Sequence, residues 1–284
     1  MTDLFEAMRL SAEDSETAHL FFSEGGKFLL PLGKPRNAVT GQEMLQRLLS
    51  PSDDDDGTLA NDFLGELGKT VPLESLRLLL TSGNARTRAT GAFLATFQNQ
   101  NISSMVGELA ALLADDNPRT RFDAVESILR CSTRGDGDHL AQALFALADE
   151  HEGVRMGAIQ FVRFAKDWQL KFARQRAASL RPQTPFSAIA GICEQWRNDT
   201  SGTIRAMLDH AEPVVRRYGL GLAGRARFVV VDAYVEWAQA SADSEISKLA
   251  TDCFEHKQIS QHAVWHSSLP AATRTSPRSN GQRR

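Results

Sequence analysis

The sequence predicts an all-α protein, a right-handed solenoid of about five or six helix pairs with an irregular N-terminal cap and a disordered C-terminal tail. Three observations predict this class. The 284-residue chain is 42% hydrophobic and 24% charged, as expected for a folded protein with a substantial core. Segments with a helix-pair pattern recur along it, each with an arginine at an equivalent place. The net charge of -3 is the sum of an acidic N-terminal segment, which suits a polar cap, a basic middle and a basic C-terminal tail.

The first 70 residues are expected to form the cap. Ser11 is a candidate N-cap for a helix over residues 12–22, and the Gly- and Pro-rich residues 25–39 suggest a hairpin or loop. Helices are then predicted at 42–49 and 58–67, separated by the acidic run 53–56. Residues 1–70 hold 13 acids and 6 bases, a net of -7, and this polarity suits the open end of a solenoid.

Helix pairs follow from residues 75, 107 and 142. Each has an apolar helix, a short turn, an arginine and a second apolar helix. The aligned arginines are Arg88, Arg121 and Arg155, spaced by 33 and 34 residues, and Arg216 matches 61 residues further on, about two periods of this repeat class. A divergent repeat is expected in the gap, with residues 185–196 as a second helix that has lost the arginine.

Acids and prolines accompany these arginines. Asp115 lies six residues before Arg121, and Asp149 lies six before Arg155; prolines stand three residues before Arg121 and Arg216. These motifs resemble the HEAT-repeat family and its bacterial HEAT-like relatives, over about residues 72–226. The resemblance implies that acids and arginines form a ladder between stacked turns.

The structural ladder assigned on this basis comprises Arg88, Asp115, Arg121, Asp149, Arg155 and Arg216. Two positions depart from the family pattern. Ser82 stands where Arg88 should have its acid, and Asp209 precedes Arg216 by seven residues instead of six.

The C-terminal part completes the predicted organisation. Residues 228–256 are expected to form a last helix pair, so the helical-repeat domain is placed at 71–256, after the cap at 1–70. Residues 257–284 are expected to form a flexible basic tail, because residues 268–284 contain four arginines, no acids and few apolar side chains.

The middle of the chain is basic. Residues 155–227 hold 13 bases and 5 acids, a net of +8. Within it, residues 163–181 mix six bases with three aromatics, Phe164, Trp168 and Phe172, whose spacing favours the buried stripe of one helix. The basic face could attract phosphate or an acidic protein surface, or could be a solvated helix face. The candidate partner-binding residues are Arg163, Lys166, Lys171, Arg174 and Arg176.

Other motifs point to chemistry only weakly. Gly219, Gly221 and Gly224 form a GxGxxG without a preceding strand, so close helix packing is favoured over nucleotide binding. A cysteine and three histidines with zinc-like chemistry are interpreted as a core thiol and surface imidazoles, and no metal is predicted; they are Cys253, His256, His262 and His266. Asp167 beside Trp168 resembles residue types of the HEAT-like alkylpurine DNA glycosylases, but no motif is shared.

No catalytic signature involves the seven histidines, so the sequence favours a non-enzymatic protein without cofactors. It predicts a protein-protein interaction scaffold, adaptor or immunity-like protein that binds an acidic protein on the concave face of the array. The alternative is a nucleic-acid-binding HEAT-like protein, a class that includes a relation to the alkylpurine DNA glycosylases. Three widely spaced cysteines, no run of about 18 apolar residues and an acidic N-terminus favour the cytoplasm. The oligomeric state stays open.

Overall fold

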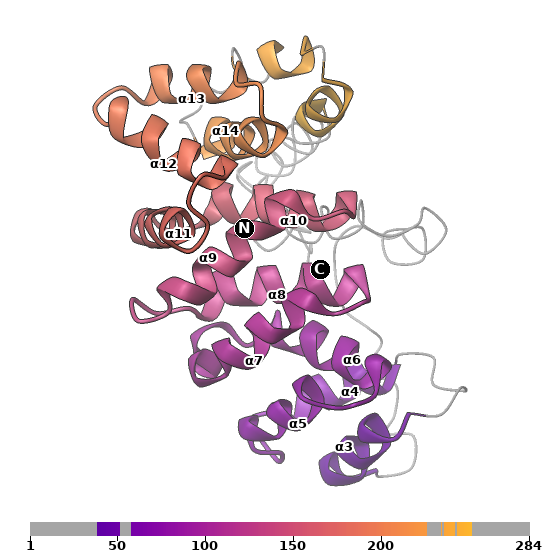
Figure 1. The fold of residues 1–284 in the computed structure, drawn as a ribbon. Helices are drawn as coiled ribbons and strands as arrows, with labels where there is room; N and C mark the ends of the chain where they lie inside the picture. Colours follow the sequence, from indigo (N-terminus) through magenta and orange to yellow (C-terminus); the bar gives the residue numbers. More distant parts are fainter. Residues whose placement is uncertain (1–38, 52–57, 226–233, 235, 242, 252–284) are drawn as a thin grey trace, which may run out of the picture.

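The computed structural model describes residues 39–51, 58–225, 234, 236–241 and 243–251, and these residues form a stack of helix pairs (Figure 1). The helices are α3 (Gly41–Leu49), α4 (Thr58–Glu66), α5 (Leu76–Leu80), α6 (Ala85–Ala95), α7 (Val106–Ala111), α8 (Pro118–Cys131), α9 (Gly137–Phe145), α10 (Glu152–Phe164), α11 (Asp167–Leu180), α12 (Pro185–Gln195), α13 (Thr200–Leu208) and α14 (Pro213–Arg225). Residues 244–251 form a further helix. The all-α prediction is confirmed: within the described ranges no strand is present, only an isolated bridge between Leu67 and Val71.

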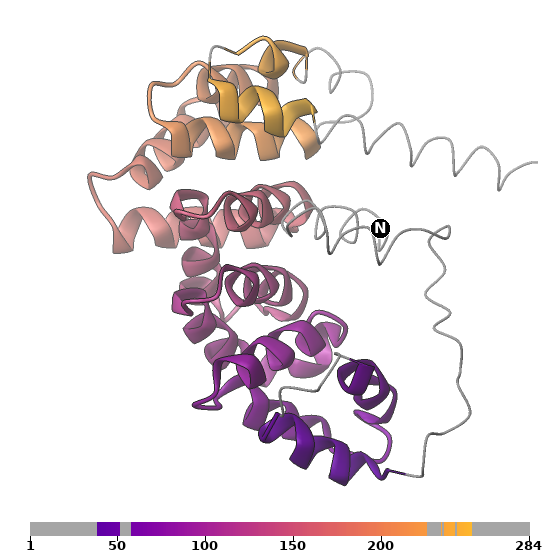
Figure 2. The same cartoon turned by 90° about the vertical axis from the view of Figure 1, so that its right-hand side faces the viewer.

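The helices lie in two rows. The first helices α5, α7, α9 and α11 pack on one another in succession, and the second helices α6, α8, α10 and α14 form the other row. In Figure 1 the first row lies to the left of the second. The N-terminal pair α3 and α4 packs on α5 and α6 at one end of the stack (Figure 2). The cap predicted for residues 1–70 therefore contains a helix pair in its described part.

Polar caps set the starts of the second helices. The side chain of Asn84 accepts hydrogen bonds from the backbone N–H groups of Arg86 and Thr87, and the side chain of Asn117 caps α8 by accepting one from the Arg119 N–H. His151 caps α10 through its Nδ1, 3.2 Å from the Gly153 nitrogen. A cap satisfies backbone donors that have no partner within the first turn of a helix. The prolines noted three residues before Arg121 and Arg216 are the first residues of α8 and α14, where a missing N–H costs nothing.

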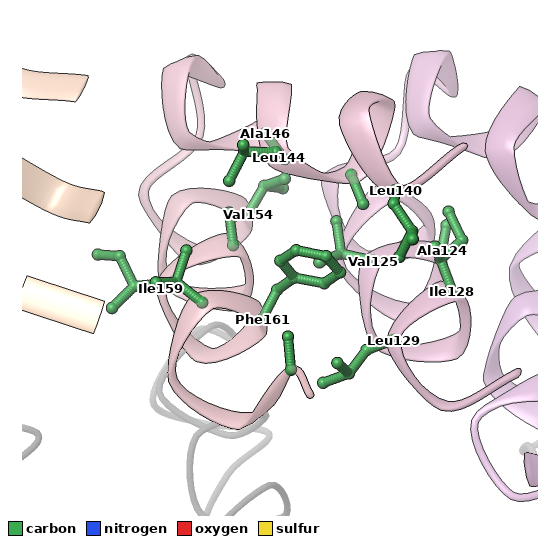
Figure 3. Close-up of a cluster of buried hydrophobic side chains, with 14 of the residues drawn as sticks. Ala124, Val125, Ile128, Leu129, Leu140, Leu144, Ala146, Val154, Ile159 and Phe161 are labelled. Atoms are coloured by element: carbon green, nitrogen blue, oxygen red, sulfur yellow. The ribbon is translucent and has the colours of Figure 1, made fainter. Parts of the chain in front are cut away.

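The core runs between the two rows. Figure 3 shows its middle, where the fully buried ring of Phe161 from α10 lies among Val125 and Leu129 of α8 and Leu140 of α9. These apolar side chains recur at helical spacing on the faces that meet. Burial of such side chains contributes most of the stability of a helix pair, because short helices are marginal alone.

The expected divergent repeat is built differently from the prediction. Residues 185–195 form helix α12, but α12 packs on α11, α13 and α14, and α14 takes the next place beside α10. Gly221 explains the direct contact: a Cβ there would lie 2.6 Å from Val162 Cβ and 3.0 Å from the Ile159 carbonyl oxygen. The two second helices thus touch where the sequence predicted a helix between them.

The aromatic stripe predicted for residues 164–172 is also interrupted. Helix α10 ends at Phe164, Ala165 has extended backbone dihedrals, and α11 begins at Asp167. The break is held because the Lys166 N–H donates to Gln169 Oε1 and the Arg225 guanidinium donates to the Ala165 carbonyl. Phe164 therefore belongs to a different helix from Trp168 and Phe172.

Several predictions fall outside the described residues. They are the helix at 12–22, most of the hairpin or loop at 25–39, the acidic run 53–56, part of the last helix pair, the basic tail, and the set Cys253, His256, His262 and His266. The domain boundaries stay predictions.

Candidate functional site

Four arginines at equivalent turns make the same pair of backbone contacts. Each donates from Nη1 to the carbonyl oxygens of the residues five and six positions earlier, so it closes the turn that precedes its helix. These arginines are Arg88, Arg121, Arg155 and Arg216. Such bonds satisfy turn carbonyls that no helix would satisfy.

The same guanidinium groups also reach acids of the next turn. Arg88 Nε lies 2.6 Å from Asp115 Oδ2, and Arg121 Nη2 lies 2.8 Å from Asp149 Oδ1. Arg216 repeats the contact with Asp243 at 2.5 Å. Each acid lies 27 or 28 residues after its arginine, so these ion pairs link successive helix pairs.

The acids in turn hold the local backbone. Asp149 Oδ1 accepts from the His151 N–H at 2.8 Å, and Asp243 Oδ1 accepts from the Glu245 N–H at 3.0 Å. Burial acts to raise the pKa of Asp149, but the hydrogen bond and charge of Arg121 outweigh it and lower the pKa. Arg216 lowers the pKa of Asp243 in the same way against burial. The carboxylates are therefore held ionised.

The ladder changes partner at Arg155. No turn acid of α11 or α12 meets it; instead its Nε lies 2.5 Å from Glu245 Oε1, 90 residues later. Arg217 binds the other oxygen of the same carboxylate at 2.5 Å and donates to the Leu147 carbonyl. Lys248 adds an ion pair with Glu152 at 2.6 Å. The helix at 244–251 is thereby joined to both α10 and α14.

The predicted partner-binding residues do not share one face. Arg163 lies in the last turn of α10 in the second row, where its guanidinium lies 5.0 Å from the centroid of the Phe164 ring. Lys166 precedes α11, and both it and Lys171 are exposed and form no ion pair with any described residue. Lys166 and Lys171 are therefore the predicted partner-binding residues that are available to a partner.

Arg174 is directed inward. Its guanidinium lies beside the Tyr218 hydroxyl and the Cys193 thiol, at the junction of α11, α12 and α14. Burial acts to lower the pKa of Arg174, and these two groups outweigh it and raise the pKa. Burial also raises the pKa of Tyr218 to about 12. Arg174 is half-buried at this junction and thus contributes to its packing.

Arg176 is exposed but engaged. It binds Asp138 of α9 through two hydrogen bonds, one of them 3.1 Å from Nη2 to Oδ2. The bond from Arg176 lowers the pKa of Asp138. The pair borders an open cleft of about 430 Å³ between the α8–α9 connection and α11, whose lining also includes Arg134, Phe172 and Gln175.

The glycine motif has a packing role. A Cβ on Gly219 would lie 2.7 Å from Met207 Cβ of α13, and one on Gly224 would lie 3.0 Å from Arg163 Cδ. Together with Gly221 against α10, these glycines let α14 approach two helices closely, as the sequence favoured. Cys131 and Cys193 are free thiols, and burial raises the pKa of Cys131 to about 12, which makes it unreactive.

The residue types shared with the glycosylases do not form a base pocket in the described structure. The Asp167 carboxylate is almost fully exposed and pairs with Arg225 at 2.5 Å. Trp168 packs edge-to-face on Phe172, with ring centroids 5.9 Å apart. Among the described residues no cluster of three His, Cys, Asp or Glu could hold a metal ion, and no described helix is long and apolar enough to cross a membrane.

Sequence reasoning missed several residues of these sites. Arg134 and Gln175 border the cleft, and their proximity depends on how α9 and α11 pack. Arg217 and Glu245 were also missed, although their separation of 28 residues is the ladder spacing and was a usable signal.

Comparison with known proteins assigns no family to this chain. No protein-family model matches the sequence, and no curated protein matches it. Among solved structures, the designed armadillo repeat protein YIII(Dq)4CqI is similar over 76% of this chain and 98% of its own, with a TM-score of 0.42 and 16% identity. The paired rows and the repeated arginine turns define the class: a helical-repeat protein.

Proposed function

We propose that this chain is a HEAT-like, non-enzymatic scaffold of bacterial type, an adaptor or immunity-like protein, that binds an acidic protein partner. One observation carries the proposal: Lys166 and Lys171 are exposed and form no ion pair with a described residue, whereas the ladder arginines are all engaged in ion pairs within the array. Long-stemmed cations that are not neutralised locally speed and orient association with an acidic surface.

The proposed contact surface differs from the sequence-based one. Of the candidate residues, only Arg163 lies on a second helix, whereas Lys171, Arg174 and Arg176 lie on α11 in the first row. We therefore place the partner on the first-row side at α11. Free cysteines in the described residues accord with a reducing cytoplasm as the proposed location.

The test is affinity isolation of the tagged full chain from its host, with bound proteins quantified by mass spectrometry. A stoichiometric acidic partner is expected, and the double variant Lys166→Glu, Lys171→Glu should lose it. The matched control is Arg47→Glu with Lys69→Glu, the same charge change on exposed residues at the N-terminal end. Absence of any stoichiometric protein partner would refute the proposal.

Nucleic acid is the competing proposal, supported by the same exposed lysines beside the half-buried pair Trp168 and Phe172. Polyanion binding weakens steeply with salt because counterions are released. Salt-titrated binding to duplex and single-stranded DNA separates the two functions. Binding no tighter than to a neutral polymer at low salt would eliminate nucleic acid.

A further inference from the structure

The cleft beside α11 combines charge with an apolar wall. It is open, has a volume of about 430 Å³, and is lined by Arg134, Gly135, Gly137, Asp138, Phe172, Gln175 and Arg176. That volume lies at the low end of ligand sites, which span roughly 300–1,000 Å³. It suits one bulky side chain better than an extended ligand.

The charge around the cleft is positive. Asp138 is neutralised by the two hydrogen bonds from Arg176, so it does not oppose an incoming carboxylate strongly. Arg134 is exposed and forms no ion pair with any described residue. Lys171 lies one helical turn before Gln175, on the same side of α11. Arg134 in the lining and Lys171 one turn from it are therefore two cations that form no ion pair with a described residue.

The apolar wall of the cleft is the Phe172 ring, which neighbouring side chains hold in place. Phe172 is half-buried against the core and meets Trp168 at an interplanar angle of 63°. A side chain already held by its neighbours loses little entropy when a partner covers it. Interface hot spots commonly pair such a preformed apolar surface with arginine.

We propose that this cleft is an anchor site for an acidic segment of the protein partner, with one bulky apolar side chain of that segment against Phe172 and its carboxylates at Arg134 and Lys171. The inference rests on the proposed function and specifies the chemistry of the partner. Charge complementarity selects this occupant, because Arg134 lines the cleft and Lys171 lies one helical turn before Gln175, which also lines it.

The test is selection of a random peptide display library on the folded full chain. Enriched peptides should carry two or more acids next to an aromatic or leucine. Their affinity should fall at least tenfold for Arg134→Glu with Lys171→Glu, and for Phe172→Ala, and should be retained by Arg134→Lys with Lys171→Arg. Circular dichroism verifies the fold of each variant, and the surface charge variants keep the test valid if Phe172→Ala unfolds.

The inference is overturned if the enriched peptides lack acids, or if they bind the Arg134→Glu, Lys171→Glu variant as tightly as the unchanged protein. It is also overturned if a 15-mer of oligothymidine binds the cleft more tightly than any selected peptide. Affinity isolation from the host distinguishes failure of the anchor site from failure of the proposed scaffold function. A host partner that is captured independently of Arg134, Lys171 and Phe172 refutes the anchor site and leaves the scaffold function standing. No captured partner refutes the scaffold function itself.

Discussion

Replacement of Arg121 by alanine should unfold the array more readily than any other change at a turn arginine. Its side chain is 9% exposed, against 15–23% for the other three. The substitution removes two hydrogen bonds to Asp149, at 2.8 and 2.9 Å, and two to the carbonyls of Asp115 and Asp116. The Asp149 carboxylate, 13% exposed, then loses its counterion.

Removing one partner of a buried ion pair costs about 3–5 kcal/mol, a large share of the roughly 5–15 kcal/mol that stabilises a typical domain. Urea unfolding followed by circular dichroism measures the loss, and hydrogen exchange should locate it at the turn between α9 and α10. The matched control is Arg176→Ala, which removes a similar two-bond contact with Asp138 at an exposed site. Exposed pairs contribute little, so no measurable change is expected there. Equal losses for Arg121→Ala and Arg176→Ala would refute the reasoning.

Three further predictions test the acids, the helix contact and the caps. The folded-state pKa of Asp149 is lowered, so its stabilising contribution is complete above the unfolded pKa of about 3.9 and is lost as pH falls through the folded pKa. The free energy of unfolding should therefore depend less on pH below about pH 4 in Asp149→Asn than in the unchanged protein. Gly221→Ala should cost about 1–3 kcal/mol in urea unfolding because its Cβ overlaps Val162, whereas Gly191→Ala, with nothing within 4 Å, should be neutral or stabilising. His151→Ala should cost about 0.5–2 kcal/mol by removing the cap of α10, and His151→Asn should restore it, measured as melting temperature; equal melting temperatures for the two variants would count against the cap.

Local spacing made the turn arginines predictable. The structure also explains one departure from the pattern: Asp115 accepts from Arg88 of the preceding pair, so an acid is needed only where an arginine precedes it. No arginine occupies the equivalent place in α4: Arg88 is the fourth residue of α6, and the fourth residue of α4 is Asn61. Arg88 is therefore the first arginine of the ladder among the described residues, and the position of Ser82 needs no acid.

Packing between distant segments could not be predicted from one sequence. Glu245 binds Arg155 from 90 residues away because α12 does not enter the second row, and that placement follows from helix contacts rather than from periodicity. The inward turn of Arg174 has the same origin, since its surroundings come from α12 and α14. The sequence identified the basic segment, but not which of its cations reach the surface.

The direct contact of α14 with α10 has a consequence for how motion spreads through the molecule. Mechanical coupling between the two halves runs along the second row and through Glu245, which holds Arg155 and Arg217 together. Helix α12 packs on both α11 and α14, so it forms a second connection between the two halves. A shift of α11 when a ligand engages it would therefore reach α14 in the second row, through α12 and through the contact of Arg174 with Tyr218.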